Sequence, residues 1–415
     1  MKANKALAAF LSAAVLLTVS VAPAGAASAA ASAAAGKTAP AATAASKTAA
    51  PAQSGGKNPA AQAGPTGVNA KSYVLAEAST GRILAQKDAH DKMPPASITK
   101  IMTELLTVQA IEQGKLKWTE LLTCSAHAAS MGGSDIWLEP GEKMSVKDLF
   151  KAMAISSAND AAVVFAEKIG GSEQGFANMM NKEAKTLGMN DTHFVNANGL
   201  DADGHVTSAY DVMLMSRELL KHQEIFNYTT VWMDSLRGGK TQLVNTNRLI
   251  RTYTGINGLK TGSTSKAGYC ISATAKRDGM ELIAVIMGAD NMKERFSSAA
   301  NLLDYGFGGW EMLSPKPKQT VWSVNVLHGV TGSVQARLGA MPQVLAEKGG
   351  DSAVEQKANV VQEVEAPIQK GQVLGQVSLL VDGKSVGTVP VTAVKAVDRM
   401  TFARAFSMLA RFLAR

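Results

Sequence analysis

Three short motifs occur in a fixed order along the chain, and their side chains together could transfer an acyl group to a serine. In chain order they are Ser97-Ile98-Thr99-Lys100, Ser157-Ala158-Asn159 and Lys260-Thr261-Gly262. A serine hydroxyl is a poor nucleophile at neutral pH unless a base lies within hydrogen-bond reach. At positions i and i+3 of a helix, Ser97 and Lys100 share one face, so the lysine amine can serve as that base.

Each motif alone is weak evidence for this chemistry. The pattern Ser-x-x-Lys also begins at Ser54 and at Ser263. Taken singly, Ser97 could be an ordinary residue of a helix N-terminus, Asn159 a loop residue and Lys260 a solvated strand end. The order of the motifs, and the structural setting that each one needs, must therefore carry the interpretation.

The first motif is predicted to lie on a helix. A helix is expected to follow Pro95, because apolar residues recur at helical spacing at Ile98, Met102, Leu105 and Val108. Ser97 then falls on the first turn, where the helix N-terminus favours negative charge. Lys100 must be uncharged to act as a base, and burial together with a second cation such as Lys260 would lower its pKa.

The other two motifs are predicted to lie on a loop and on a strand. Helical patterns from 145 to 187 are interrupted at 156–160, which places Ser157 and Asn159 between two helices, where they could relay a proton and orient a peptide. Lys260, Thr261 and Gly262 fall in a predicted strand at 258–263. At a sheet edge such a strand can dock a substrate backbone, with lysine and threonine meeting a carboxylate.

Around these motifs the pattern indicates an α+β fold. An opening hairpin (73–76 and 82–85), a helix at 210–220, strands at 268–275 and 282–288 joined through Asp278-Gly279, and a closing helix at 296–305 form a first domain, 71–314. Pro315 and Pro317 mark its end. Short strands predict a small all-β domain at 315–397, with members at 321–326, 333–338, 360–364, 376–381 and 385–391.

The two ends of the chain are predicted to lie outside these domains. Residues 1–26 have two lysines, a short apolar run and an Ala-Gly-Ala ending, which is typical of a secretory signal; an uncleaved anchor is the alternative. Residues 27–70 have almost no large apolar side chains and predict a flexible tether. We therefore expect the mature protein to work outside the cytoplasm.

The last segment, 398–415, predicts an amphipathic helix that lies on a membrane surface. Phe402, Phe406, Leu409 and Leu413 fall on one face, whereas Arg404, Arg411 and Arg415 fall on the other. The alternative is a terminal helix packed on its own protein. The net charge of +8 permits attraction to anionic surfaces, but no basic run interleaved with aromatic residues favours nucleic-acid binding.

Neither metal nor disulfide chemistry is favoured by the sequence. The six histidines and two cysteines show no metal-ligand spacing, so we expect no metal and no cofactor. Cys270 lies in an apolar run and Cys124 is distant along the chain. Buried free thiols are favoured, and a single disulfide between them is the alternative.

From about Ser72 to Leu413 the chain resembles the D-alanyl-D-alanine carboxypeptidases, which are low-molecular-mass penicillin-binding proteins. The stretches that carry this resemblance are residues 94–103 around Ser97, Ser157-Ala158-Asn159-Asp160-Ala161-Ala162, Asn198-Gly199-Leu200 and Gly258-Leu259-Lys260-Thr261-Gly262. It implies a penicillin-recognising, β-lactamase-like domain with an antiparallel sheet flanked by helices. A β-rich domain and an amphipathic tail at the outer face of the cytoplasmic membrane would follow.

The resemblance also implies roles for the residues. Ser97 would be acylated by a peptidoglycan stem peptide ending in D-Ala-D-Ala, with Lys100 as base and Ser157, Asn159 and Lys260 in support. The backbone N–H groups of Ser97 and Ser263 would form the oxyanion hole, beside Thr261 and Gly262. Arg295 matches a family arginine implicated in binding the substrate's terminal carboxylate. Some members carry histidine where this chain has Ser263, a change that keeps the backbone N–H.

Two other functions share some of these sequence features. Class A β-lactamases of this fold use a glutamate four residues before an asparagine for deacylation, and no such pair lies between Ser157 and Lys260. Penicillin is therefore expected to acylate Ser97 and remain bound. The second alternative is an inactive, membrane-tethered wall-binding protein, against which the three intact motifs argue.

Overall fold

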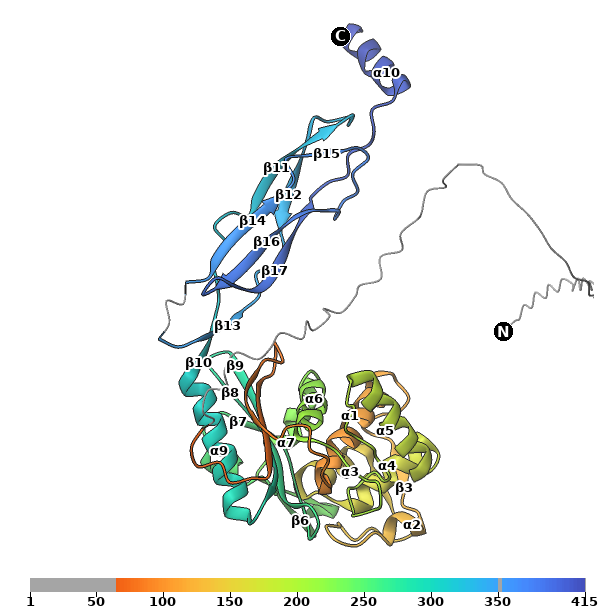
Figure 1. The fold of residues 1–415 in the computed structure, drawn as a ribbon. Helices are drawn as coiled ribbons and strands as arrows, with labels where there is room; N and C mark the ends of the chain where they lie inside the picture. Colours follow the sequence, from red (N-terminus) through yellow and green to blue (C-terminus); the bar gives the residue numbers. More distant parts are fainter. Residues whose placement is uncertain (1–64, 350–352, 415) are drawn as a thin grey trace, which may run out of the picture. The chain divides into compact units, whose positions relative to one another are not determined.

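The structure is a computed structural model that describes residues 65–349 and 353–414 (Figure 1). The predicted signal, 1–26, most of the predicted tether, 27–70, and Arg415 lie outside these residues. At the start of the described part, the Gly67 carbonyl accepts a hydrogen bond from Asn301, and the backbone N–H of Asn69 donates one to Ser298. Ordered contacts with the first domain thus begin a few residues before position 71.

A five-stranded antiparallel sheet forms the centre of the first domain, in the order β2-β1-β9-β8-β7. Its strands are β1 (Ser72–Glu77), β2 (Ile83–Lys87), β7 (Ile256–Thr264), β8 (Gly268–Arg277) and β9 (Met280–Ala289). The predicted hairpin between β8 and β9 is present, and both turn residues have positive φ, 48° at Asp278 and 82° at Gly279. Strand β7, which carries the third motif, lies at one edge of this sheet.

Both faces of the sheet are covered, as the alternating side chains of β9 show. Ile283, Val285 and Met287 belong to one buried cluster, and Leu282, Ala284 and Ile286 belong to the other. Helix α9 (Met292–Gly309) packs on the second face, and α6 (Ala209–Leu219) packs on the first (Figure 1). This two-sided burial explains why β9 is an almost continuous apolar run.

The helices that lie between β2 and β7 in the sequence form the helical part of the first domain, which faces the edge strand β7. The longer ones are α1 (Lys100–Glu112), α3 (Val146–Ser156), α4 (Asn159–Gly170) and α5 (Glu173–Leu187). Short elements complete this part: α2 (Ala126–Ala129), α7 (Phe226–Thr229), α8 (Leu249–Thr252), β3 (Leu121–Thr123) paired with β4 (Lys143–Ser145), and β5 (Met233–Leu236) paired with β6 (Thr241–Val244). Cys124 and Cys270 are both buried and free, so the disulfide alternative is not realised.

The β-rich part has its own core and a six-stranded sheet in the order β14-β16-β17-β12-β11-β15. Its strands are β11 (Val321–Leu327), β12 (Ser333–Leu338), β14 (Glu355–Val360), β15 (Glu363–Glu365), β16 (Val373–Val381) and β17 (Lys384–Ala393). The single strand predicted at 360–364 is wrong, because the chain leaves β14 at one end of the sheet and joins β11 at the other as β15. A separate pair, β10 (Trp310–Leu313) and β13 (Val344–Glu347), was not predicted. The domain boundary at 315 stays a prediction.

The last described helix, α10 (Phe402–Leu413), is exposed along its whole length. Phe402 and Phe412 have exposed fractions of 88% and 79%, and no residue of the helix is buried. Within the described residues, no helix has the length and apolar content that a membrane crossing requires.

Candidate active site

Ser97 lies in a tight turn that precedes α1. Residues Ala96–Thr99 form a 3-10 helix, so the first turn differs from the α-helical turn predicted for it. In a 3-10 helix the side chains at i and i+3 are aligned, which brings Ser97 over Lys100. Ala96 has a φ of 49°, a left-handed conformation that is strained for a residue with a side chain and is found mainly where the surroundings enforce it.

The Lys100 amine contacts Ser97 and two further oxygen atoms. Its Nζ lies 3.1 Å from Ser97 Oγ, 2.5 Å from Asn159 Oδ1 and 2.7 Å from the carbonyl oxygen of Asn198. Asn159 Nδ2 donates to the Gly132 carbonyl, which fixes Oδ1 toward the lysine. A neutral amine has two N–H donors and one lone pair. Because Asn159 Oδ1 and the Asn198 carbonyl can only accept, the lone pair is left for the Ser97 hydroxyl proton.

The surroundings favour this neutral amine. Lys100 is fully buried, and burial lowers its pKa well below the ordinary value for lysine. The positive charge of Lys260 lowers this pKa further, whereas the carboxylates of Glu104, Asp135 and Asp160 oppose the shift. Both causes proposed from the sequence, burial and a second cation, are therefore present.

The second motif contributes a free hydroxyl and a fixed amide. Ser157 follows the end of α3 with a φ of 66°, and its buried Oγ has no hydrogen-bond partner among the described residues. Asn159 was predicted on a loop but is the first residue of α4. Its backbone N–H donates to the Ser134 carbonyl, so the amide that meets Lys100 is held from two sides.

The third motif lies on the edge strand β7, directly beside the nucleophile. Lys260 is buried, its Nζ donates to the Thr261 carbonyl, and burial lowers its pKa to about 8. A Cβ atom on Gly262 would lie 2.8 Å from the backbone nitrogen of Ser97 and 2.9 Å from that of Ile98. Only glycine therefore allows β7 to approach the Ser97 turn this closely.

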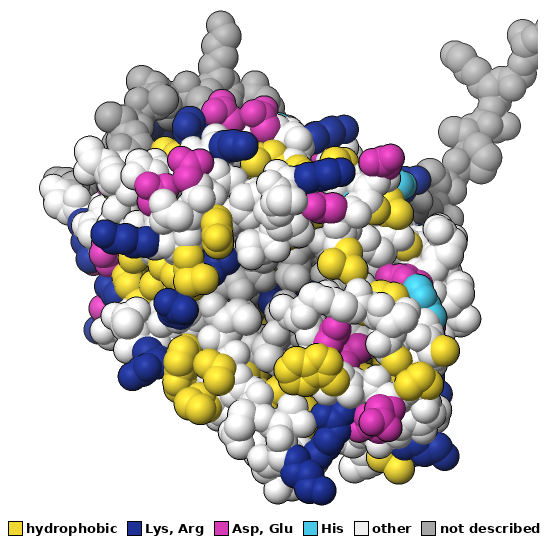
Figure 2. All heavy atoms as spheres, turned by 90° about the horizontal axis from the view of Figure 1, so that it is seen from below, with side chains coloured by type: hydrophobic (Ala, Val, Ile, Leu, Met, Phe, Trp, Pro, Cys, Tyr) yellow, Lys and Arg dark blue, Asp and Glu magenta, His cyan; other side chains and the backbone are white. Residues whose placement is uncertain are grey.

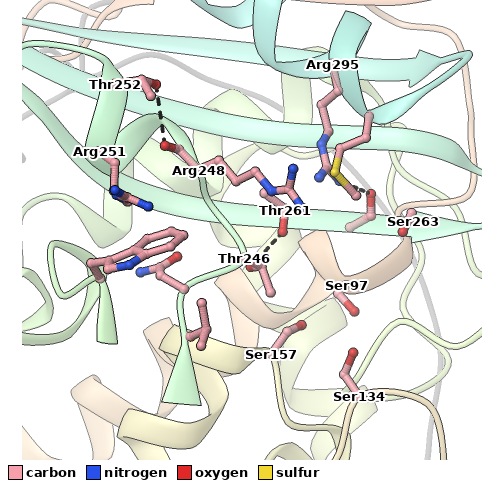
Figure 3. A pocket seen from close by; sticks show the side chains of 15 residues that line it. Ser97, Ser134, Ser157, Thr246, Arg248, Arg251, Thr252, Thr261, Ser263 and Arg295 are labelled. Atoms are coloured by element: carbon pink, nitrogen blue, oxygen red, sulfur yellow. Dashed lines mark hydrogen bonds between the residues drawn. The ribbon is translucent and has the colours of Figure 1, made fainter. Parts of the chain in front are cut away.

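A cavity of about 830 Å³ opens between β7 and the helices (Figure 3). In Figure 3 the hydroxyls of Ser97, Ser134 and Ser157 gather on one side, and Arg248 and Arg295 approach from the side of β7. Three arginines and no carboxylates are found among the described residues that line it. The space-filling view shows a hollow on one face of the molecule with basic, acidic and hydrophobic side chains around it (Figure 2). This cavity is suited to an anionic ligand.

Arg295 is buried against aromatic rings at the wall of the cavity. Its guanidinium lies 4.5 Å from the Phe296 ring and 5.6 Å from the Tyr269 ring, and Nη1 donates to the Gly262 carbonyl at 3.4 Å. Its Nε atom is buried and has no partner among the described residues. Burial lowers its pKa to about 10, so the side chain stays positively charged at neutral pH.

Two family models and several known proteins match the sequence of this chain. A model of the D-alanyl-D-alanine carboxypeptidase family matches residues 58–291, and a model of the penicillin-binding protein 5 C-terminal domain matches residues 312–399. The carboxypeptidase DacF of Bacillus subtilis is 44% identical over 338 residues, which cover 80% of this chain and 87% of the relative. The chain belongs to the D-alanyl-D-alanine carboxypeptidase family. The carboxypeptidase DacC of Escherichia coli is 33% identical over 344 residues, with 81% of this chain and 86% of the relative covered.

The fold of these carboxypeptidases is also confirmed by a solved structure. Penicillin-binding protein 5 from Haemophilus influenzae superposes with a TM-score of 0.71 and 30% sequence identity, covering 83% of this chain and 100% of that one. The predicted α+β class, with a β-rich domain after the first, is thus confirmed. So is the predicted activity, that of a serine-type D-Ala-D-Ala carboxypeptidase of the penicillin-binding class.

The structure brings the predicted residues of this carboxypeptidase site together and adds others to which the sequence had assigned no role. Arg248 and Arg251 line the cavity, and the Arg251 guanidinium lies 5.1 Å from the Trp232 ring. Gly199 packs against the Ser97 turn, where a Cβ atom would lie 1.9 Å from the Ala96 carbonyl oxygen. Glu104 is buried beside the two lysines; its position four residues after Lys100, on the same helix face, was the one available signal.

Proposed function

We propose that Ser97 attacks the carbonyl of the penultimate D-Ala of a peptidoglycan stem peptide, with Lys100 as the general base. The observation that carries this proposal is the buried Lys100 amine, which lies 3.1 Å from Ser97 Oγ and has two other oxygens for its N–H groups. The lone pair takes the hydroxyl proton as the C–O bond forms. The peptide C–N bond then breaks, and the leaving D-Ala amine receives a proton through Ser157, whose hydroxyl has no other described partner.

The remaining residues hold the substrate and the charge that develops. The substrate's terminal carboxylate is bound by Thr261, Lys260 and Arg295, which lie on or beside β7. The oxyanion is bound by the backbone N–H groups of Ser97 and Ser263, a role that needs the close approach permitted by Gly262. Water then hydrolyses the ester on Ser97 and restores the free enzyme. Penicillin enters the same path, opens its β-lactam ring on Ser97, and stays attached.

The proposal is tested by removing the nucleophile. Ser97→Ala should abolish release of D-Ala from diacetyl-Lys-D-Ala-D-Ala, since no other hydroxyl in the described part of the chain donates to or accepts from the Lys100 amine. Ser263→Ala is a matched control, because it changes the other described Ser-x-x-Lys serine and keeps the backbone N–H. The activity of Ser263→Ala should stay within about tenfold of the parent activity, because the change alters the side chain and leaves the backbone N–H of the oxyanion hole in place. Activity in Ser97→Ala equal to that of the control would contradict the proposal.

We also propose that the protein is exported and attached to the outer face of the cytoplasmic membrane. The supporting features are the signal-like residues 1–26, the tether-like residues 27–70 and helix α10, whose apolar residues are all exposed. Phe402 and Phe406 would enter the acyl boundary, and Arg404 and Arg411 would meet anionic headgroups.

Deletion of residues 398–415 tests this attachment. The truncated protein should lose binding to vesicles that contain anionic lipid and keep D-Ala release from the soluble peptide. The full-length chain on vesicles of neutral lipid is the control, where binding should be weaker because the electrostatic part is absent. An unchanged membrane fraction after the deletion would rule out α10 as the anchor.

A further inference from the structure

A buried carboxylate lies next to the two lysines of the site and has no role in the steps above. Glu104 is one helical turn after Lys100 on α1 and is 1% exposed, and its Oε1 atom has no hydrogen-bond partner among the described residues. Lys100 and Lys260 are equally buried, at 0% and 1%. A buried carboxylate without hydrogen bonds is unfavourable unless nearby positive charge compensates it.

Two charged groups act on Glu104 directly. They are Lys100 on its own helix and Lys260 on β7, which packs against α1. Each lysine has further charged neighbours: Asp135 and Asp160 act on Lys100, and Arg295 acts on Lys260. Glu104 is the one carboxylate among the described residues that acts on both.

We propose that Glu104 is a positioning residue whose negative charge keeps Lys260 protonated while Lys100 remains neutral. The inference rests on the proposed roles of the two lysines, of which the first must be a free amine and the second a cation that meets the substrate carboxylate. Burial disfavours charge on both lysines alike. The single negative charge of Glu104 lies near both lysines, so it can compensate the positive charge of only one of them. Lys100 is the lysine that gives up its proton, because full burial and the positive charge of Lys260 together lower its pKa well below the ordinary value.

The effect of Glu104 should depend on pH in a defined direction. Burial raises the pKa of Glu104 to about 7, so its negative charge is present above that pH and is lost below it. Lys260 has a pKa of about 8, which burial lowers and Glu104 raises. The activity that depends on charged Lys260 is lost as the pH rises through this pKa. Without the carboxylate, that loss should occur at lower pH.

The test compares pH profiles of kcat/KM for D-Ala release in the full-length protein. Glu104→Gln should agree with the parent within about twofold at pH 6, where Glu104 is largely protonated, because both then lack the charge. Its alkaline limb should move to lower pH by about one unit, the size of shift that a nearby charge produces. At pH 9 the variant should therefore be about tenfold less active than the parent.

Two further variants separate charge from structure. Glu104→Asp keeps the charge and should retain the parent's alkaline limb even if its overall rate is lower. Glu112→Gln makes the same chemical change at an exposed position of α1 and should leave the profile unmoved. A Glu104→Gln profile lowered equally at every pH, or an unshifted alkaline limb, would overturn the inference. If instead Ser97→Ala retained activity, the proposed mechanism itself would be wrong, so the two failures are distinguishable.

Discussion

Replacing Gly262 with alanine should separate the edge strand from the nucleophile. The new Cβ would lie 2.8 Å from the Ser97 nitrogen, 2.9 Å from the Ile98 nitrogen and 3.0 Å from the Ala96 Cβ. Ordinary contact begins near 3.4 Å, so β7 and the Ser97 turn must move apart by about 0.6 Å. Two of the three neighbours are backbone atoms, which cannot rotate away as a flexible side chain could.

This displacement would act on the proposed oxyanion hole, in which one donor belongs to Ser97 and the other to Ser263 on the displaced strand. Loss of one well-placed donor lowers kcat by about 10²- to 10³-fold in other acyl-transfer enzymes. We therefore expect Gly262→Ala to lower kcat/KM for D-Ala release, and the rate of penicillin acylation, by about 10²-fold or more. The thermal unfolding midpoint should fall by only a few degrees, because the rest of the sheet is unaffected.

The assay needs a glycine that tolerates a side chain. Gly387 lies in β17, has no positive φ, and has no atom within 4 Å of its Cβ position. Gly387→Ala should leave kcat/KM for D-Ala release and the rate of penicillin acylation within about twofold of the parent values, because the new Cβ makes no steric contact. Full activity in Gly262→Ala would refute the reasoning, because it would mean that the approach of β7 to Ser97 is unimportant for catalysis.

Three more predictions concern the proposed base Lys100, the two cavity arginines Arg248 and Arg251, and the buried carboxylate of Asp160. Lys100→Met should lower penicillin acylation by about 10²- to 10⁴-fold, measured by stopped-flow mixing, since general-base assistance is lost; a smaller effect would assign the base elsewhere. Arg248→Gln with Arg251→Gln should weaken the dependence of kcat/KM on salt, because two charges that attract anionic substrates are removed; an unchanged salt slope would contradict this. Asp160→Ala should lower the free energy of unfolding by about 2 to 4 kcal/mol in urea titrations, because Asp160 accepts from two buried loop N–H groups; a change below about 0.5 kcal/mol would show that these bonds are replaced.

The parts of the site that the sequence predicted are those with short-range signals. Ser97 and Lys100 could be paired because three positions on a helix fix their relation, whether the turn is 3-10 or α-helical. The turn at Asp278 and Gly279 could be predicted because few residues adopt positive φ at both positions. Local geometry was sufficient for both.

The parts that could not be predicted depend on contacts distant in sequence. The carbonyl that orients Lys100 belongs to Asn198, 98 positions away in the sequence. Because it is a backbone atom, the residue type at this position does not indicate the contact. In the sequence, Arg248 and Arg251 look like ordinary surface charges, and only the fold shows that they line the cavity. The apolar run near Val360 predicts one strand. Periodicity does not show that its first part ends β14 and its last part forms β15, at opposite edges of one sheet.

The proposed mechanism requires that Ser97 is the residue that is acylated. Mass spectrometry of the full-length protein after exposure to penicillin, followed by proteolysis, measures this directly. One adduct is expected, on the peptide that contains Ser97, and it should persist for longer than the time needed to acylate. An adduct on another serine, or rapid release of hydrolysed penicillin with no adduct, would contradict the mechanism.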